Sequence, residues 1–573
     1  MKFYHYLKKS NNALLWILFS VFFALSIILS LLDVIPSRDV AFRYAPMAEA
    51  FAIGDWDFAF HPRVPLAMSV IAGGLCWLLK CSGFMACKIV SSLFYSLTVF
   101  PVYGIGRRVF KNDHLVIFIS VILAGLCSHL IRLGSSGLRD SIKEFAIALA
   151  VYGIISIYQQ RNKFNSFLWC FIGVGLLILS RVDAVLFALI IAISALIFDL
   201  IATKIRFPWR TLVSSLVTLL IILPNLIYNY HTVGYPVPES RFAVIIDKVI
   251  PQIYNKNAIP GLHRKKVVPN QQISPAPTLS TTPAKVSKTV SKTVTKVTQK
   301  ITPVHTIKSG SENDLKQYFR NITIGIYPYY FFFALIVIIY RIKCHLWTKE
   351  ETILLSAYLI HTIGVLAQIV IHDRYFYVSP RYLTPGTVLY LYWTAICLIA
   401  IAKFLYRTLP RKIRGGIVSA LISGCVIALI LDGAGPIIKD YTSNKKIMRR
   451  KHSIAIAKRI RQHYQTFKVA PSPTPIINIF SYRVNKSPAI YSNDLKVVSY
   501  LANGRNITLN NIANSDYIVY SYRENLTKKN KPIHLPPKFT KAQKICIYQT
   551  ISRNGKYRYT SHLFFNNQGE MAK

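Results

Sequence analysis

Acidic residues are scarce in this chain of 573 residues. It contains 23 Asp and Glu against 69 Lys and Arg, which gives a formal net charge of +46. Only 16% of its residues are charged, against about a quarter in an average soluble domain, while 53% are hydrophobic. This combination excludes a cytosolic enzyme and a disordered tail. It also disfavours a nucleic-acid-binding protein, in which the positive charge gathers on a soluble fold.

Cysteine is present but without pattern. Most of the nine cysteines lie in or beside apolar runs, and none of them has the spacing of a metal-ligand motif. This distribution disfavours a disulfide-rich scaffold and a zinc module.

Long apolar runs dominate what remains. The first, 13–32, carries no charge and is long enough to cross a hydrocarbon core of about 30 Å. Because Lys2, Lys8 and Lys9 precede it and no small-residue cleavage site follows, we predict an uncleaved first helix. Ten further spans, eleven in all, are predicted at 87–106, 114–131, 140–158, 165–180, 184–203, 211–230, 322–340, 351–371, 382–403 and 416–436.

The short apolar stretch Val64–Leu79 decides the topology. If it does not cross, and the N-terminus is cytoplasmic, the Lys and Arg clusters after the spans ending near 106, 158, 203, 340 and 403 all lie inside. If it crosses, all of them move outside, against the positive-inside rule. We therefore predict an interfacial or re-entrant helix on the outer face, and a multi-pass protein of the inner (plasma) membrane.

The chain divides into two predicted domains. Residues 1–436 form the polytopic α-helical membrane domain, with an outer loop at 33–86 and a basic, disordered insertion rich in Pro, Ser, Thr and Lys at 262–310. Residues 437–573 combine a helical pattern with short β-rich runs, and this predicts a small extracytoplasmic α/β domain. The β-rich runs are Ile476–Phe480, Ala489–Tyr491, Val497–Leu501, Tyr517–Tyr522 and Ile545–Ile551. That domain has 25 Lys and Arg against 5 Asp and Glu, which suits anionic lipid or acidic glycan. A chain-wide lysine bias explains the charge equally well.

The outer loop 33–86 holds the residues best suited to chemistry. Asp39 follows the first span closely, where a carboxylate can act as a general base at the membrane surface. Cations that could hold a phosphate lie nearby: Arg38, Arg43, His61 and Arg63. Taken alone, these are ordinary loop charges.

Three motifs together resemble a known family. Asp39 is followed by Gly54-Asp55-Trp56 and His61-Pro62 before the re-entrant helix; Gly137-Leu138-Arg139-Asp140-Ser141 opens a later span; and Ser379-Pro380-Arg381-Tyr382-Leu383-Thr384-Pro385 precedes a late helix. Their order and shared outer placement resemble the membrane-embedded glycosyltransferases of the GT-C superfamily, in the bacterial branch related to protein O-mannosyltransferases and the lipid A aminoarabinose transferase.

The resemblance implies an enzyme that moves a sugar from a polyprenyl-phosphate donor to an acceptor on the outer face, usually with inversion. By this resemblance Asp39 is the catalytic general base and Asp140 a second catalytic acid. His61 lies near the substrate, and Arg381 pairs with the leaving phosphate. The other expected substrate-binding residues are Arg43, Arg63, Arg374 and Tyr382. The absence of a nucleotide-sugar domain with an Asp-x-Asp loop also favours a lipid-linked donor.

The sequence departs from the family pattern at two points. A tandem Asp-Glu is replaced by Asp39-Val40, and Arg43 stands where an aromatic residue is common. These departures leave open whether the acceptor is lipid, glycan or protein, and whether a divalent metal is used; no cofactor is certain.

The sequence also leaves other functions and interpretations open. A transporter or flippase of lipid-linked sugars, and a catalytically inactive envelope-assembly protein of the same architecture, remain as alternatives. Arg181 and Asp183 at a span boundary favour a structural capping pair over substrate contact. The aromatic run 327–333 fits an interfacial belt better than a lipid groove. Besides membrane lipids, the expected partners are the donor and the acceptor, and no nucleic acid.

Overall fold

The computed structural model describes residues 11–32, 39–60, 64–111, 113–160, 163–203, 207–233, 312–372 and 379–408, five strands between 489 and 565, and a few isolated positions. The predicted insertion at 262–310 and the predicted span at 416–436 lie outside the described residues, apart from Gly424.

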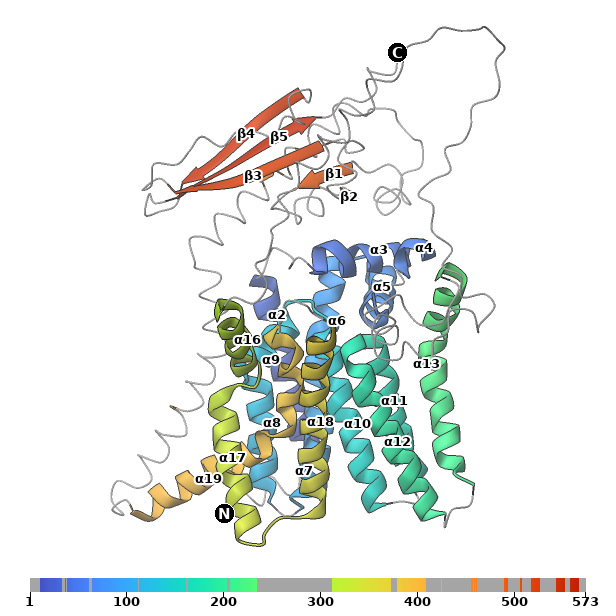
Figure 1. The fold of residues 1–573 in the computed structure, drawn as a ribbon, viewed down its shortest axis with the longest axis vertical. Coiled ribbons are helices and arrows are strands. Elements are labelled where there is room, and N and C mark those ends of the chain that lie inside the picture. The colour runs from blue at the N-terminus through green and yellow to red at the C-terminus, as the bar shows by residue number, and fades with distance from the viewer. Residues whose placement is uncertain are drawn as a thin grey trace.

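Helices make up the described part of residues 1–408 (Figure 1). The first half contains α2 (Asn11–Leu32), η1 (Val40–Tyr44), α3 (Ala45–Ala52), α4 (Trp56–Ala59), α5 (Ala67–Leu79), α6 (Gly83–Leu97), α7 (Val99–Val109), α8 (His114–Leu126), α9 (Ser128–Ser135), α10 (Asp140–Gln159), α11 (Phe164–Ser180), η2 (Val182–Ala184), α12 (Val185–Ala202) and α13 (Trp209–Val233). The second half contains α16 (Glu312–Gly325), α17 (Pro328–Lys343), α18 (Lys349–His372), η3 (Pro380–Tyr382), η4 (Thr384–Leu389) and α19 (Leu391–Thr408).

Within this described part, seven helices are long and apolar enough to cross a membrane, or up to nine if each of two bent pairs counts as one span. The bent pairs are α8 with α9, at 53°, and the end of α16 with α17, at 66°. The chain is therefore a helical protein with several candidate membrane spans, as expected. Helix α5 has 13 residues, about 20 Å at 1.5 Å per residue, which is shorter than a hydrocarbon core.

The two bends meet. Tyr327 has a left-handed backbone (φ 54°) between α16 and α17, and its hydroxyl lies 2.9 Å from that of Ser128, the first residue of α9. The ring of His129 meets the Tyr327 ring edge to face, with centroids 4.9 Å apart. The break in one span is thus tied by side chains to the break in the other.

One core runs through the helical bundle, and small residues bring its helices together. A Cβ on Gly153 of α10 would lie 2.5 Å from the Cys170 backbone of α11, and one on Gly173 would lie 2.6 Å from Ala150. Reciprocal glycines thus allow the α10 and α11 backbones to approach closely, as small residues do between membrane helices.

A second, smaller core lies under the outer-loop elements. Residues of η1, α3, α5 and α6 bury their apolar side chains together, and they are joined by Leu138, just before α10, and by Ile142, in its first turn. Figure 1 shows α3 and α4 across one end of the bundle, and the strands beyond that same end. The second core therefore fixes η1, and with it Asp39, against the start of α10.

The strands form one mixed sheet in the order β2-β1-β3-β5-β4. They are β1 (Ala489–Ser492), β2 (Arg505–Ile507), β3 (Tyr517–Asn525), β4 (Gln543–Ile551) and β5 (Tyr557–Phe565). Strand β1 pairs in parallel with β2 and β3, whereas β3, β5 and β4 are antiparallel. The runs at 489–491, 517–522 and 545–551 are strands. The runs at 476–480 and 497–501 lie outside the described residues, and β2 and β5 were not predicted.

Candidate active site

Asp39 and Arg381 form an ion pair although 342 positions separate them in the sequence. Asp39 is the residue before η1, and Arg381 is the central residue of η3, between α18 and α19. Arg381 Nη2 lies 2.7 Å from Asp39 Oδ2, and the two side chains keep 30% and 28% of their surface exposed. The pair is thus open to a ligand while remaining largely enclosed by protein.

Opposing effects set the pKa of Asp39. Burial is the largest single effect and raises it, but the charge and hydrogen bond of Arg381, together with the charges of Arg43 and Arg139, bring the pKa below its usual value. Burial opposes the charge of Arg381, but Asp140 and Asp39 raise its pKa above the usual value. Both groups are therefore fully charged at neutral pH.

A buried ionic network adjoins this pair. Arg181 Nη1 lies 2.6 Å from Asp140 Oδ1, and Arg181 Nε lies 2.6 Å from Asp183 Oδ1. The other oxygen of Asp183 is 2.7 Å from Lys143 Nζ. Arg181, Asp140 and Lys143 are 5%, 1% and 0% exposed. Charges this deeply buried are tolerated because each has a partner of opposite sign within hydrogen-bond distance.

Tyr382 joins the network to the open pair. Lys143 Nζ donates to the Tyr382 carbonyl oxygen at 3.1 Å. The Arg181 guanidinium lies 4.2 Å from the centre of the Tyr382 ring, and that of Arg381 lies 5.6 Å from it. The buried charges therefore hold Tyr382 in place, and Tyr382 positions its neighbour Arg381.

Arg139 brings a further cation to the site. Its guanidinium lies 5.5 Å from the centre of the buried Tyr44 ring. Among the described residues, nothing hydrogen-bonds to its buried Nε and Nη1 atoms. Gly137, with φ +70°, makes the turn that leads into Arg139 and Asp140, a backbone conformation that glycine adopts without strain.

Cations outnumber carboxylates here. Arg139, Lys143, Arg181 and Arg381 face Asp39, Asp140 and Asp183, and the exposed Arg43 adds a fifth positive charge near Asp39. Glu144, one turn along α10, is buried, and within the described residues no ion pair joins it to the network. The excess positive charge and the unbonded nitrogens of Arg139 suit an anionic ligand such as a phosphate.

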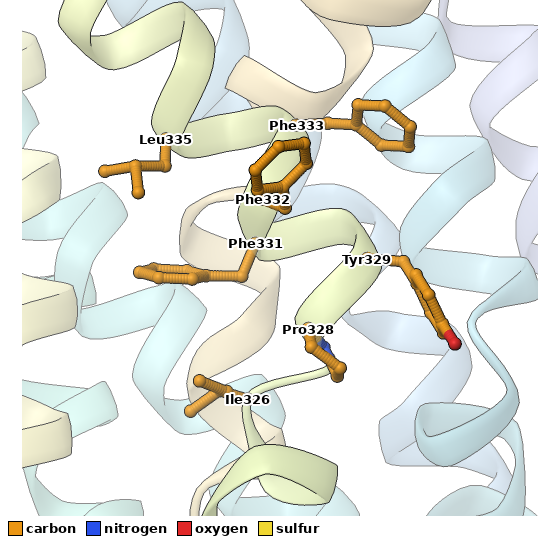
Figure 2. Close-up of a pocket in the computed structure, with 7 residues that line it drawn as sticks. All are labelled: Ile326, Pro328, Tyr329, Phe331, Phe332, Phe333 and Leu335. Carbon is orange, nitrogen blue, oxygen red and sulfur yellow. The ribbon is translucent and has the colours of Figure 1, made fainter.

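An apolar pocket lies close to Tyr382. It has a volume of about 360 Å³, and it is lined by Ile326, Pro328, Tyr329, Phe331, Phe332, Phe333 and Leu335. Figure 2 shows Ile326, Phe331 and Leu335 projecting to the same side of the chain at the start of α17. Ile326 also packs in the small apolar cluster that contains Tyr382 and Leu383. One residue of the pocket and one residue of the ionic site therefore pack against the same apolar cluster.

The structure brings together four of the eight predicted site residues: Asp39, Asp140, Arg381 and Tyr382. Arg43 is exposed and influences Asp39 through its charge. His61, Arg63 and Arg374 lie outside the described residues. Four positions of the site were not among those predicted. The sequence predicted a structural capping pair for Arg181 and Asp183, and it gave no role to Lys143 or Arg139.

A signal for Lys143 was present in the sequence. A lysine one turn into an apolar span is costly unless it is paired, and such residues usually mark a functional site. For metal binding, no group of three or more His, Cys, Asp or Glu in the described ranges is arranged to hold an ion. The site's three aspartates each pair with a cation instead.

Residues 61–228 match the model of the family described as dolichyl-phosphate-mannose-protein mannosyltransferase. This match confirms the resemblance to GT-C glycosyltransferases that the sequence motifs indicated. It includes Asp140, Lys143, Arg181 and Asp183 but neither Asp39 nor Arg381. No curated protein matches the sequence.

Two solved structures can be compared with the chain. The apo oligosaccharyltransferase of Archaeoglobus fulgidus is 12% identical with a TM-score of 0.45, covering 89% of this chain and 69% of that one. Apo ArnT from Cupriavidus metallidurans is 10% identical with a TM-score of 0.48, covering 96% and 98%. Both TM-scores lie below 0.5, so these two likenesses alone do not classify the chain.

Proposed function

We propose that this chain transfers a sugar from a polyprenyl-phosphate donor to an acceptor on the outer face of the membrane, with inversion at the sugar and with Asp39 as general base. The observation that carries the proposal is the open Asp39–Arg381 pair beside a cluster with excess positive charge. A carboxylate and a guanidinium 2.7 Å apart supply the two groups that the reaction needs, a base for the acceptor and a cation for the leaving phosphate.

Donor binding activates the base in this mechanism. The phosphate draws the Arg381 guanidinium away from Asp39, and Arg139 with its unbonded Nε and Nη1 takes further phosphate oxygens. Once Arg381 is shared with phosphate, the main effect that lowers the pKa of Asp39 weakens, while burial still raises it. Asp39 thus becomes a stronger base when the donor is in place.

The transfer itself is a single displacement. Asp39 removes the proton from the acceptor hydroxyl or amine, whose lone pair attacks the anomeric carbon. The bond from that carbon to the phosphate oxygen breaks, and the phosphate leaves as an anion stabilised by the guanidinium groups. One displacement inverts the configuration. Asp140, which forms an ion pair with the buried Arg181, holds the cationic cluster in its orientation.

The proposal also keeps the predictions that the structure does not test. We propose that His61, Arg63 and Arg374 contact the substrate, and the apolar pocket near Tyr382 supports a lipid-linked donor. The N-terminus is cytoplasmic, with eleven spans, and residues 437–573 form an α/β domain on the outer face of the inner membrane.

The test is transfer of radiolabelled sugar from a panel of polyprenyl-phosphate donors in membranes. We expect Asp39→Asn to abolish transfer while the protein still inserts in the membrane. Glu350→Gln removes a carboxylate in the same isosteric way at the start of α18, far along the bundle, and should keep wild-type activity. Near-full activity of Asp39→Asn would remove Asp39 from the mechanism. Donor binding without transfer by wild type would favour the flippase or the inactive binding protein instead.

A further inference from the structure

Three cysteines gather where α5 turns into α6. Cys76 lies in the last turn of α5 and Cys87 in the first turns of α6, and both are fully buried. Cys81, in the connection between the helices, is partly buried and packs against the same apolar core. The sugar-transfer mechanism uses none of these thiols.

The end of α5 brings two of them together. Lys80 has a left-handed backbone (φ 51°, ψ 30°), a strained conformation for a residue with a side chain. When a helix ends at a left-handed residue, the next residue folds back over the helix and contacts the position five before it. Here those two positions are Cys81 and Cys76, and the Cys76 side chain is near enough to lower the pKa of the Cys81 thiol against the effect of burial.

This turn is also tied to the element that carries Asp39. The backbone N–H of Gly83, two residues after Cys81, donates to Glu49 Oε1 at 2.8 Å, and Glu49 lies on α3, directly after η1. A Cβ on Gly83 would lie far too close to the Ala45 carbonyl oxygen, so α6 begins in direct contact with α3. The thiol pair thus lies in the layer that holds the catalytic end together.

We propose that Cys76 and Cys81 are a redox pair, which closes to a disulfide by exchange with an oxidised thiol–disulfide oxidoreductase. The partly exposed Cys81 thiolate attacks the oxidant's disulfide, forming a mixed disulfide and releasing one thiol of the oxidant. The Cys76 thiolate then attacks the Cys81 sulfur and releases the second. The two cysteines lose two electrons and two protons, and the oxidant's disulfide becomes two thiols.

The rate of disulfide formation depends on how readily the Cys81 thiol loses its proton. Burial raises the pKa of the Cys81 thiol, with the Glu49 charge acting in the same direction. Since the thiolate is the attacking species, closure should accelerate as the pH rises toward that pKa. Cys87 is the other cysteine of the cluster that could form a disulfide with Cys76 in place of Cys81.

The experiment uses the purified full-length protein, exposed to oxidised glutathione, alkylated, denatured and digested with trypsin. Cleavage after Arg63, Lys80 and Lys88 separates Cys76, in peptide 64–80, from Cys81 and Cys87, in peptide 81–88. We expect the two peptides to be recovered joined, two hydrogens lighter than their sum, and to separate on reduction.

Matched variants identify the bond. Cys87→Ser should keep the link, and Cys81→Ser should lose it. Recovery of both peptides with every cysteine alkylated after oxidation would overturn the proposal, as would a link that survives in Cys81→Ser. The assay contains no sugar donor, so its outcome is independent of the proposed sugar transfer.

Discussion

At the scale of single residues, the candidate site is governed by competition for Arg381. The same guanidinium that lowers the pKa of Asp39 is the group proposed to receive the phosphate. Because the folded pKa of Asp39 is lowered, the pair stabilises the fold above the unfolded value of about 4. That contribution is lost as the pH falls through the folded value.

Replacing Arg381 should therefore change both rate and pH dependence. In Arg381→Gln, burial acts on Asp39 without its main counter-charge, so the pKa of Asp39 rises and the acid limb of the kcat/KM profile moves to higher pH. We also expect kcat to fall roughly 10²-fold, as when one oxyanion donor is removed. Arg381→Lys keeps the charge and should leave the acid limb near its wild-type position. An unshifted limb in Arg381→Gln would contradict the assigned role of the pair.

Sequence reasoning found the site residues that stand in motifs better than the charges that pair with them. Asp39, Asp140 and Arg381 stand in motifs near predicted span ends, where a charged residue is easy to recognise whether it is exposed or buried. Arg181 and Asp183 were visible as a pair, but their real partners, Asp140 and Lys143, lie on another helix. Which charges meet across helices depends on how α10 packs, and no local pattern encodes that.

At the scale of elements, the buried network joins α10, η2 and η3. Lys143→Met should destabilise the protein by about 1–3 kcal/mol, because it removes one of the two cations that pair with the partly buried Asp183 carboxylate. Lys143→Met combined with Asp183→Asn should cost less than the sum of the two single changes. Unfolding by denaturant in detergent micelles measures both. Strict additivity would show that the two side chains do not interact.

The contact between α10 and α11 gives a second test at this scale. Gly153→Ala places a methyl group against the Cys170 backbone and should cost about 1–3 kcal/mol. Gly74→Ala in α5 is the matched control, since a Cβ there has nothing within 4 Å and alanine favours a helix. The same unfolding measurement applies. Equal stability of the two variants would mean that α10 and α11 can separate without cost.

Helix positions were predicted closely where apolar runs are long. The predicted spans 140–158, 165–180 and 184–203 correspond to α10, α11 and α12 within one residue at each end. The span predicted at 382–403 instead begins with η3 and η4, and α19 starts only at Leu391. Hydropathy could not reveal this because 383–391 carries no charge and so continues the uncharged run of the span. Pro380 and Pro385 open the two short turns, and the Lys143 contact to Tyr382 fixes the first.

At the scale of the whole molecule, the proposed topology places the catalytic end outside. The connection between α17 and α18 lies at the opposite end of the bundle from α3 and α4 (Figure 1). It carries the exposed Cys344, whereas α4 carries Trp56, which is 51% exposed. These two positions report on opposite sides of the membrane.

Two single-cysteine proteins test this topology with a membrane-impermeant maleimide. The protein that keeps only Cys344 should be labelled in inside-out vesicles and not in intact cells. The protein whose only cysteine is introduced by Trp56→Cys should give the reverse. If the two patterns are exchanged, the catalytic end faces the cytoplasm and the proposed outer-face transfer fails with it.

The contact between Ser128 and Tyr327 has a mechanical consequence. Each of the two residues lies at the break in a bent span, and the bond between their hydroxyls joins the breaks at one depth. If either span straightens, it must pull the other with it or lose the hydrogen bond and the edge-to-face contact with His129. The bends in the two spans are therefore mechanically coupled. One of the coupled helices, α16, packs against η3, the turn that carries Arg381, so a change in either bend would also act on that turn.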